Sequence, residues 1–142
     1  MKKIFRNCKS RRAFACLSAA APSALMAMSE FAGAYYIDHG DIVISRDETN
    51  TMVQQGTNGP VVDNENITIT QNNSAVATDN TITVDSSATD SQIVLGNVNI
   101  AAEDAAAMDV QGSASVELSG ENSLTGGKGA AGLEVEGYHY RR

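Results

Sequence analysis

Four acidic side chains are spaced so that a backbone that repeats every ~25 residues would bring them to one face. Asp109 and Glu134 are one such interval apart, and Asp85, Gln111 and Glu136 would form a second row beside them. Like charges on neighbouring strands repel each other unless a cation lies between them, and carboxylate oxygens are ligands that Ca²⁺ prefers. The spacing therefore predicts a calcium site whose ligands are Asp85, Asp109, Glu134 and Glu136.

Two other interpretations of these acids stay open. The rows can form a solvated acidic face that holds no ion. Asp85 and Asp90 also flank a Ser/Thr turn, where they could chelate a cation locally, although Asp is common in turns because its side chain caps the backbone. Calcium is the one cofactor that the sequence suggests.

Catalysis needs further groups that the chain supplies poorly. Proton abstraction beside a bound metal ion needs a basic side chain, such as Lys, Arg or His, close to that ion. We expect Arg46 in a polar loop after the first strand and Lys128 in a Gly-rich turn, so that neither lies on the acidic rows. His39 and His139 are close to opposite ends of the chain. We therefore expect a protein that is not an enzyme and has no catalytic residues.

The elements that must position these side chains are short β-strands. Apolar–polar–apolar triplets recur through the chain and predict strands with one buried face. Gly, Asn, Asp and Ser separate them and supply turns. The triplets lie at 42–44, 67–69, 82–84, 93–95, 98–100, 108–110, 116–118 and 133–135. They predict an all-β chain.

A near-constant sequence interval orders these strands. Residues 107–112 recur as 132–137, and residues 41–45 recur as 66–70. Three short strands per repeat of about 25 residues predict a three-sided parallel β-helix over residues 35–137. A β-sandwich or an array of hairpins is the alternative, but the strands of a sandwich need not be periodic. The predicted columns are Ile42, Ile67, Ile93 and Val116; then Ile82, Met108 and Leu133, with Val62 as a candidate first member; then Val98 and Leu124.

Residues 1–34 have the features of a signal peptide. Six cations precede an Ala-rich apolar stretch, and the small residues Ala32, Gly33 and Ala34 favour cleavage after Ala34. Adjacent Arg11 and Arg12 leave twin-arginine export open beside the ordinary route. We expect a secreted or cell-surface protein whose mature part has no membrane span.

Removal of residues 1–34 changes the charge of the protein. That segment holds six of the ten Lys and Arg residues and one of the 17 Asp and Glu residues, so residues 35–142 keep four cations and 16 acids, a net charge of −12. Such a surface argues against nucleic acid as a partner, because phosphate binding needs a basic patch. Both cysteines, Cys8 and Cys16, also lie in the removed segment, so the mature chain has no disulfide.

The runs 40–44, 66–70, 106–112 and 116–127 are similar to those of bacterial surface proteins with a right-handed parallel β-helix, the carbohydrate-binding domain family whose fold resembles polysaccharide lyases. The resemblance covers residues 36–137. It implies an exported, calcium-associated module that binds an acidic, plant-type or cell-wall polysaccharide. Residues 138–142 depart from the repeat, which suggests an N-terminal fragment whose open last coil self-associates.

We therefore expect an exported, non-catalytic β-helix module that binds polysaccharide at the cell surface. The alternative is a structural stalk or adhesin repeat segment that projects other domains. A polysaccharide lyase-like enzyme fragment is the second alternative.

Overall fold

A computed structural model of the protein describes residues 34–136. The predicted signal peptide, apart from Ala34, and the tail at 138–142 lie outside these residues. The described chain is all-β, as the triplets predict, and no helix in it is long and apolar enough to cross a membrane. It contains a 3-10 helix at Ile37–His39 and the strands β1 (Tyr35–Tyr36), β2 (Ile42–Asp47), β3 (Asn50–Gln55), β4 (Val61–Val62), β5 (Ile67–Thr70), β6 (Ile82–Val84), β7 (Ser91–Gly96), β8 (Asn99–Ala101), β9 (Met108–Val110), β10 (Ala114–Ser119), β11 (Ser123–Thr125) and β12 (Leu133–Val135).

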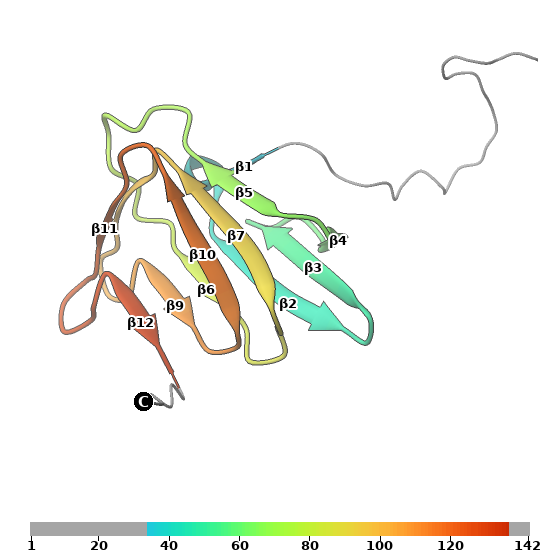
Figure 1. The fold of residues 1–142 in the computed structure, drawn as a ribbon. Coiled ribbons are helices and arrows are strands. Elements are labelled where there is room, and N and C mark those ends of the chain that lie inside the picture. Colours follow the sequence, from blue (N-terminus) through green and yellow to red (C-terminus); the bar gives the residue numbers. More distant parts are fainter. Residues whose placement is uncertain (1–33, 137–142) are drawn as a thin grey trace, which may run out of the picture. The chain divides into compact units, whose positions relative to one another are not determined.

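The first set of parallel strands runs in the order β1-β5-β7-β10. Ile67 lies opposite Ile93, and Ile93 lies opposite Val116, so three members of the first predicted column are confirmed. Figure 1 shows β5, β7 and β10 side by side. Ile42 is not in this set, and that part of the prediction is wrong, because Tyr35 of β1 lies opposite Ile69 and β1 pairs with β5 instead.

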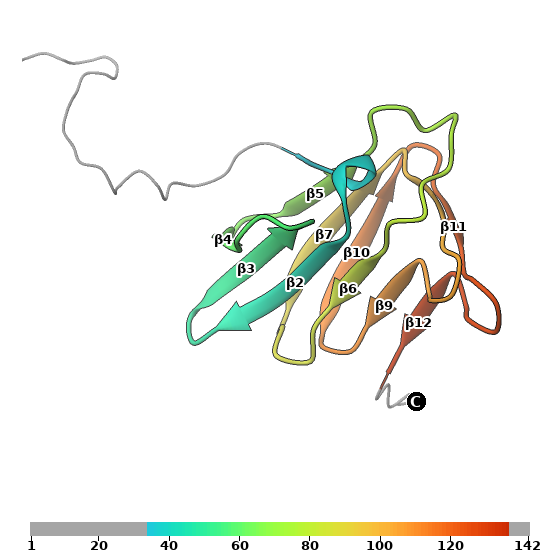
Figure 2. The same ribbon diagram turned by 180° about the vertical axis from the view of Figure 1, so that it is seen from behind.

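A second set of parallel strands contains β2, β6, β9 and β12, seen from behind in Figure 2. Ile82, Met108 and Leu133 lie in register, which confirms the second predicted column. Its first member is Ile42, which lies opposite Ile82, and not Val62. The segment between Ile42 and Ile82 includes β3, β4 and β5, so the chain departs here from the regular interval of the later strands.

Strands β3 and β4 account for that departure. β3 pairs antiparallel with β2 through a turn of Glu48 and Thr49, in which Glu48 has a φ of 54°. β4 pairs antiparallel with β3, and Val62 lies opposite Met52. A purely parallel arrangement is therefore wrong for this segment. The antiparallel strands follow β2 at the edge of the second set, on the side opposite β6.

The third set consists of β8 and β11, and Thr78 forms an isolated parallel bridge to Ile100 of β8. The register pairs Leu124 with Ile100, so the predicted pairing of Leu124 with Val98 is wrong. Val98 is buried at the bend before β8, where its N–H donates to Asn122 Oδ1 at 3.0 Å. Val98 and Ile100 are both apolar and flank Asn99, so the sequence does not show which of them lies opposite Leu124.

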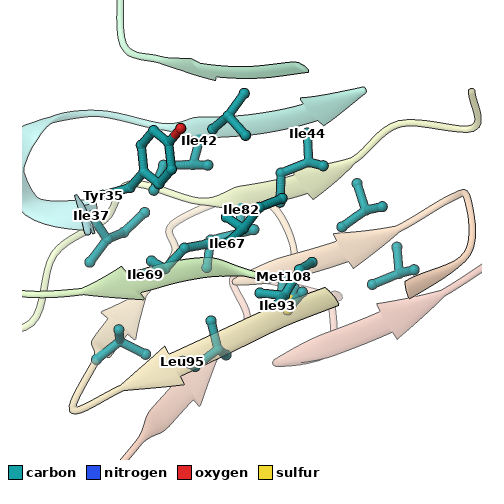
Figure 3. Packing of buried hydrophobic residues seen from close by; sticks show 14 of the residues in the cluster. Tyr35, Ile37, Ile42, Ile44, Ile67, Ile69, Ile82, Ile93, Leu95 and Met108 are labelled. Carbon is teal, nitrogen blue, oxygen red and sulfur yellow. The ribbon is translucent and has the colours of Figure 1, made fainter. Parts of the chain in front are cut away.

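The buried core is made by alternate residues of these strands. The fully buried side chains include Ile67, Ile69, Ile93 and Leu95 of the first set and Ile42, Ile44, Ile82, Val84 and Met108 of the second. Figure 3 shows how side chains from both sets gather between the strands. Burial of each such side chain contributes about 1.5–3 kcal/mol. Ile, Val and Leu make up most of this core, and Tyr35, Met108 and small Ala side chains complete it.

Candidate functional site

The strand register brings part of the predicted acidic row together. Asp109 of β9 lies opposite Glu134 of β12 and, on its other side, opposite Thr83 of β6. Both acids therefore lie on neighbouring strands, at the separation at which like charges repel. Glu134 is exposed, whereas Asp109 is partly buried.

Asp85 and Glu136 follow their strands at equivalent positions. The N–H of Asp85 donates to Ile44 O at 2.7 Å, and the N–H of Glu136 donates to Val110 O at 2.9 Å. Gln111 lies between them in the same pattern, since its N–H donates to Val84 O at 2.8 Å. Asp85 and Glu136 are thus two strands apart, and the three residues form the second predicted row.

Local hydrogen bonds occupy several of these carboxylates. Asp85 Oδ1 accepts from the Ser87 N–H at 2.8 Å, and this bond holds the pKa of the Asp85 carboxyl below its usual range. Asp90 Oδ1 accepts from Ser113 Oγ at 3.2 Å. Asp109 Oδ2 accepts from Gln111 Nε2 at 2.8 Å, while its buried Oδ1 has no partner among the described residues.

Within residues 34–136, no three His, Cys, Asp or Glu side chains are grouped closely enough to hold a metal ion. Asp109 and Glu134 supply carboxylates from two neighbouring strands, and any further oxygens would come from water or a bound ligand. Ca²⁺ takes six to eight oxygens and accepts water among them. The calcium sites, at the acidic row and locally between Asp85 and Asp90, stay predictions.

Three basic residues, Arg46, Lys128 and His39, lie in the described part of the chain. Arg46 is inside β2 and not in a loop, so that prediction is wrong; its Nη2 donates to Thr49 O at 3.3 Å across the hairpin turn. The N–H of Lys128 donates to Glu103 O at 3.1 Å, in the Gly-rich turn where the sequence predicts it. His39 Nε2 lies 2.9 Å from Asn72 Nδ2.

A hollow that the sequence does not predict lies beside the loop connecting β5 to β6. We call this cavity of about 580 Å³ the polar groove. Three segments line it: the 3-10 helix, the β5–β6 loop and the end of β8 with the residues after it. Its polar lining residues are Asp38, Gln71, Asn73, Thr78, Asp79 and Glu103.

Gln71 holds the loop that forms one wall of the polar groove. This side chain is buried, and its Nε2 donates to Val76 O at 2.7 Å and to Asn73 O at 3.1 Å. Its Oε1 accepts from the Asn99 N–H at 2.7 Å. One amide therefore fixes the curve of the β5–β6 loop against β8, and the groove is built by the fold.

Hydrogen-bond acceptors dominate the exposed lining of the groove. Asp38 Oδ2 accepts from the Asn72 N–H at 3.2 Å, whereas its buried Oδ1 has no partner in the described part of the chain. Asp79 and Glu103 add two exposed carboxylates, and the lining contains no Lys, Arg or His from residues 34–136. The apolar members are Val76, Ala77 and Ala101. Such a site accepts hydrogen bonds from a hydroxyl-rich or cationic ligand.

The lining residues are up to 65 positions apart, which explains why sequence reasoning misses the groove. The sequence feature that relates to the groove is the polar run at 71–80, which predicts turns and Asn-lined corners. No family model, no curated protein and no solved structure matches the chain. The resemblance to carbohydrate-binding β-helix domains therefore stays an expectation that the residues alone carry.

Proposed function

We propose that residues 34–136 form a short parallel β-helix whose three sides are the three sets of parallel strands. The register from β5 onward supports this interpretation, because paired residues there are 23 to 26 positions apart: Ile67 and Ile93, Ile93 and Val116, Ile82 and Met108, Met108 and Leu133, and Ile100 and Leu124. Consecutive strands from β6 to β12 also fall in different sets in a fixed rotation. The antiparallel strands β3 and β4 would then close the first coil.

We infer further that the protein is an exported, non-catalytic module that binds polysaccharide at the cell surface. The observation that carries this proposal is the polar groove, whose volume of about 580 Å³ lies within the range of small-ligand sites. Sugar hydroxyls are hydrogen-bond donors, and the groove offers them carboxylate and amide oxygens. The resemblance to carbohydrate-binding β-helix domains points to the same ligand class.

The negative charge of the groove lining restricts the class of glycan that can bind. Asp38, Asp79 and Glu103 would repel a uronate unless a cation lay between the carboxylates. The groove therefore favours a neutral glycan directly and an acidic glycan through calcium, the co-ligand that the acidic sequence suggests. The lining contains no Lys, Arg or His from residues 34–136, and this favours binding over lyase chemistry in which such a side chain is the base beside the uronate.

Isothermal titration of the full chain against neutral and uronate oligosaccharides, with calcium and with a chelator, tests this function. We expect a neutral oligosaccharide to bind both with calcium and with the chelator. We expect a uronate oligosaccharide to bind only when calcium is present. Glu103→Ala should weaken binding by about tenfold, as expected for the loss of a hydrogen bond to a charged group. Asp104→Ala is the matched control, since this neighbouring exposed acid does not line the groove. Failure of every glycan to bind would refute the proposal.

A structural stalk or adhesin segment is the second candidate. The observation that favours it is that each of the three sets ends in an edge strand in the described chain; these edge strands are β10, β11 and β12. A stalk needs no ligand, so this function predicts that the groove variants and their controls behave alike.

A further inference from the structure

Strand β10 has an open edge. It pairs with β7 over all six of its residues, and no other strand in the described part of the chain lies beside it. Ser113 O and Ser119 O accept from the N–H groups of Ser91 and Asn97, both at 3.1 Å. Because the backbone groups of successive strand residues point to opposite edges, the odd-numbered residues of β10 face β7. The N–H and C=O groups of Ala114, Val116 and Leu118 therefore face the open edge.

The same three residues carry the apolar side of β10. Ala114 and Val116 pack against the core as partly buried side chains. Leu118 lies opposite Leu95, which is fully buried, yet Leu118 itself is 63 % exposed. Unpaired backbone groups beside uncovered apolar side chains form a surface that is suited to another β-strand.

We propose that this edge pairs antiparallel with β10 of a second copy, about a two-fold axis at Val116. In that register Val116 lies opposite Val116 of the second copy, and Ala114 lies opposite Leu118 in both directions. All the backbone groups that face the open edge then find partners, and the apolar side chains of both copies share one face. A surface that complements itself in this way gives a closed dimer.

Charge and alternation select this register. The outward Glu117 lies opposite Ser115, so no acid faces an acid directly across the new pair. A shift of the pairing by two residues would place Glu117 opposite Glu117, where like charges destabilise the sheet. A shift by one residue would turn apolar side chains against outward polar ones.

At the other end of the molecule β2 already has β3 as its antiparallel neighbour, so a second copy cannot extend the second set by stacking head to tail. Pairing of β10 with β10 about a two-fold axis needs no such contact and closes on itself. The exposed Glu117 residues of the two copies would nonetheless be diagonal neighbours across the new pair and bring acidic charge close together. Salt screens such charges, so the dimer should strengthen as ionic strength rises.

Sedimentation equilibrium of the full chain over a series of concentrations tests the dimer. We expect a monomer–dimer equilibrium that shifts toward dimer in salt and that Leu118→Lys weakens by at least about tenfold, as for a charge placed in an apolar interface. Val61→Lys is the matched control, because Val61 is 47 % exposed and lies in β4, outside β10 and the polar groove. The control should dimerise like the unchanged protein.

Cysteine cross-linking tests the register in a chain carrying Cys8→Ser and Cys16→Ser. A hydrogen-bonded antiparallel pair has a Cα separation of about 5.5 Å, which suits a disulfide. Val116→Cys should therefore give a cross-linked dimer on mild oxidation, whereas Leu118→Cys should not. Equal cross-linking of both variants would overturn the register. A chain that stays monomeric at every concentration, with Leu118→Lys and Val61→Lys alike, would overturn the dimer and indicate that another segment covers β10.

Discussion

Tyr35 Oη donates a hydrogen bond of 2.9 Å to Asp63 Oδ2, and both residues are buried. Tyr35 belongs to β1 in the first set of strands, whereas Asp63 follows β4 and its N–H donates to Thr51 O at 2.9 Å. Asp63 Oδ1 also accepts from the Glu65 N–H at 3.2 Å. The bond from Tyr35 therefore joins the first strand to the antiparallel segment that the repeat does not predict.

Removal of this bond should destabilise the fold. Tyr35→Phe leaves Asp63 Oδ2 buried without its donor, and such a change costs about 1–3 kcal/mol of unfolding free energy. Denaturant unfolding followed by circular dichroism measures the loss. Tyr36→Phe is the matched control, because Tyr36 is the exposed neighbour in the same strand. Equal stability of the two variants would show that the bond contributes nothing.

The same contact predicts an alkaline limit to stability. Burial and the neighbouring Asp63 carboxylate raise the pKa of the Tyr35 hydroxyl well above its usual range. The unfolded chain releases this proton near pH 10, whereas the folded chain still holds it, so stability is present below pH 10 and falls as pH rises further. Unfolding free energies between about pH 9 and 11 should fall more steeply in the unchanged protein than in Tyr35→Phe. Equal slopes of unfolding free energy against pH in the two proteins would contradict the assignment of this effect to Tyr35.

Alternation of apolar and polar residues is enough to predict most strands. The triplets at Ile67, Ile82, Ile93 and Met108 are all strands with both apolar members buried. Their partners follow from the offset, because the number of intervening residues varies little. Alternation identifies a strand and its buried face, but it does not identify which neighbour that strand pairs with.

Three features lie beyond that logic. Residues 41–45 resemble 66–70 closely, so the repeat places Ile42 in the column of Ile67, although it pairs with Ile82. β3 contains Met52 and Val53 side by side without alternation, so no pattern indicates a strand there. The polar groove depends on contacts between distant segments, such as that of Gln71 with Asn99, and no local pattern encodes these.

Gly112 is required by the close approach of two backbone segments. A Cβ atom at this position would lie 2.4 Å from both Ala88 O and Asp85 O, closer than real contacts allow. Gly112→Ala should therefore lower the unfolding free energy by about 1–3 kcal/mol, as overpacking does. Gly59→Ala is the control, since nothing lies within 4 Å of its Cβ position and the change should stay within about 0.5 kcal/mol. Thermal unfolding of both variants tests this requirement for Gly112, and similar melting temperatures of the two variants would contradict it.

The opposition of Asp109 and Glu134 predicts a charge effect that calcium should modulate. With a chelator present, Glu134→Lys replaces a repulsive cross-strand pair by an attractive one, which should raise the unfolding free energy by about 0.2–1 kcal/mol. If calcium binds between the two carboxylates, it should raise the melting temperature of the unchanged protein and leave that of Glu134→Lys unaltered, because the variant repels the ion. Glu121→Lys changes the net charge equally at an exposed position outside the acidic row, so it should keep the calcium response. A response retained in Glu134→Lys would place the ion elsewhere, and no response in any protein would leave the row as a solvated acidic face.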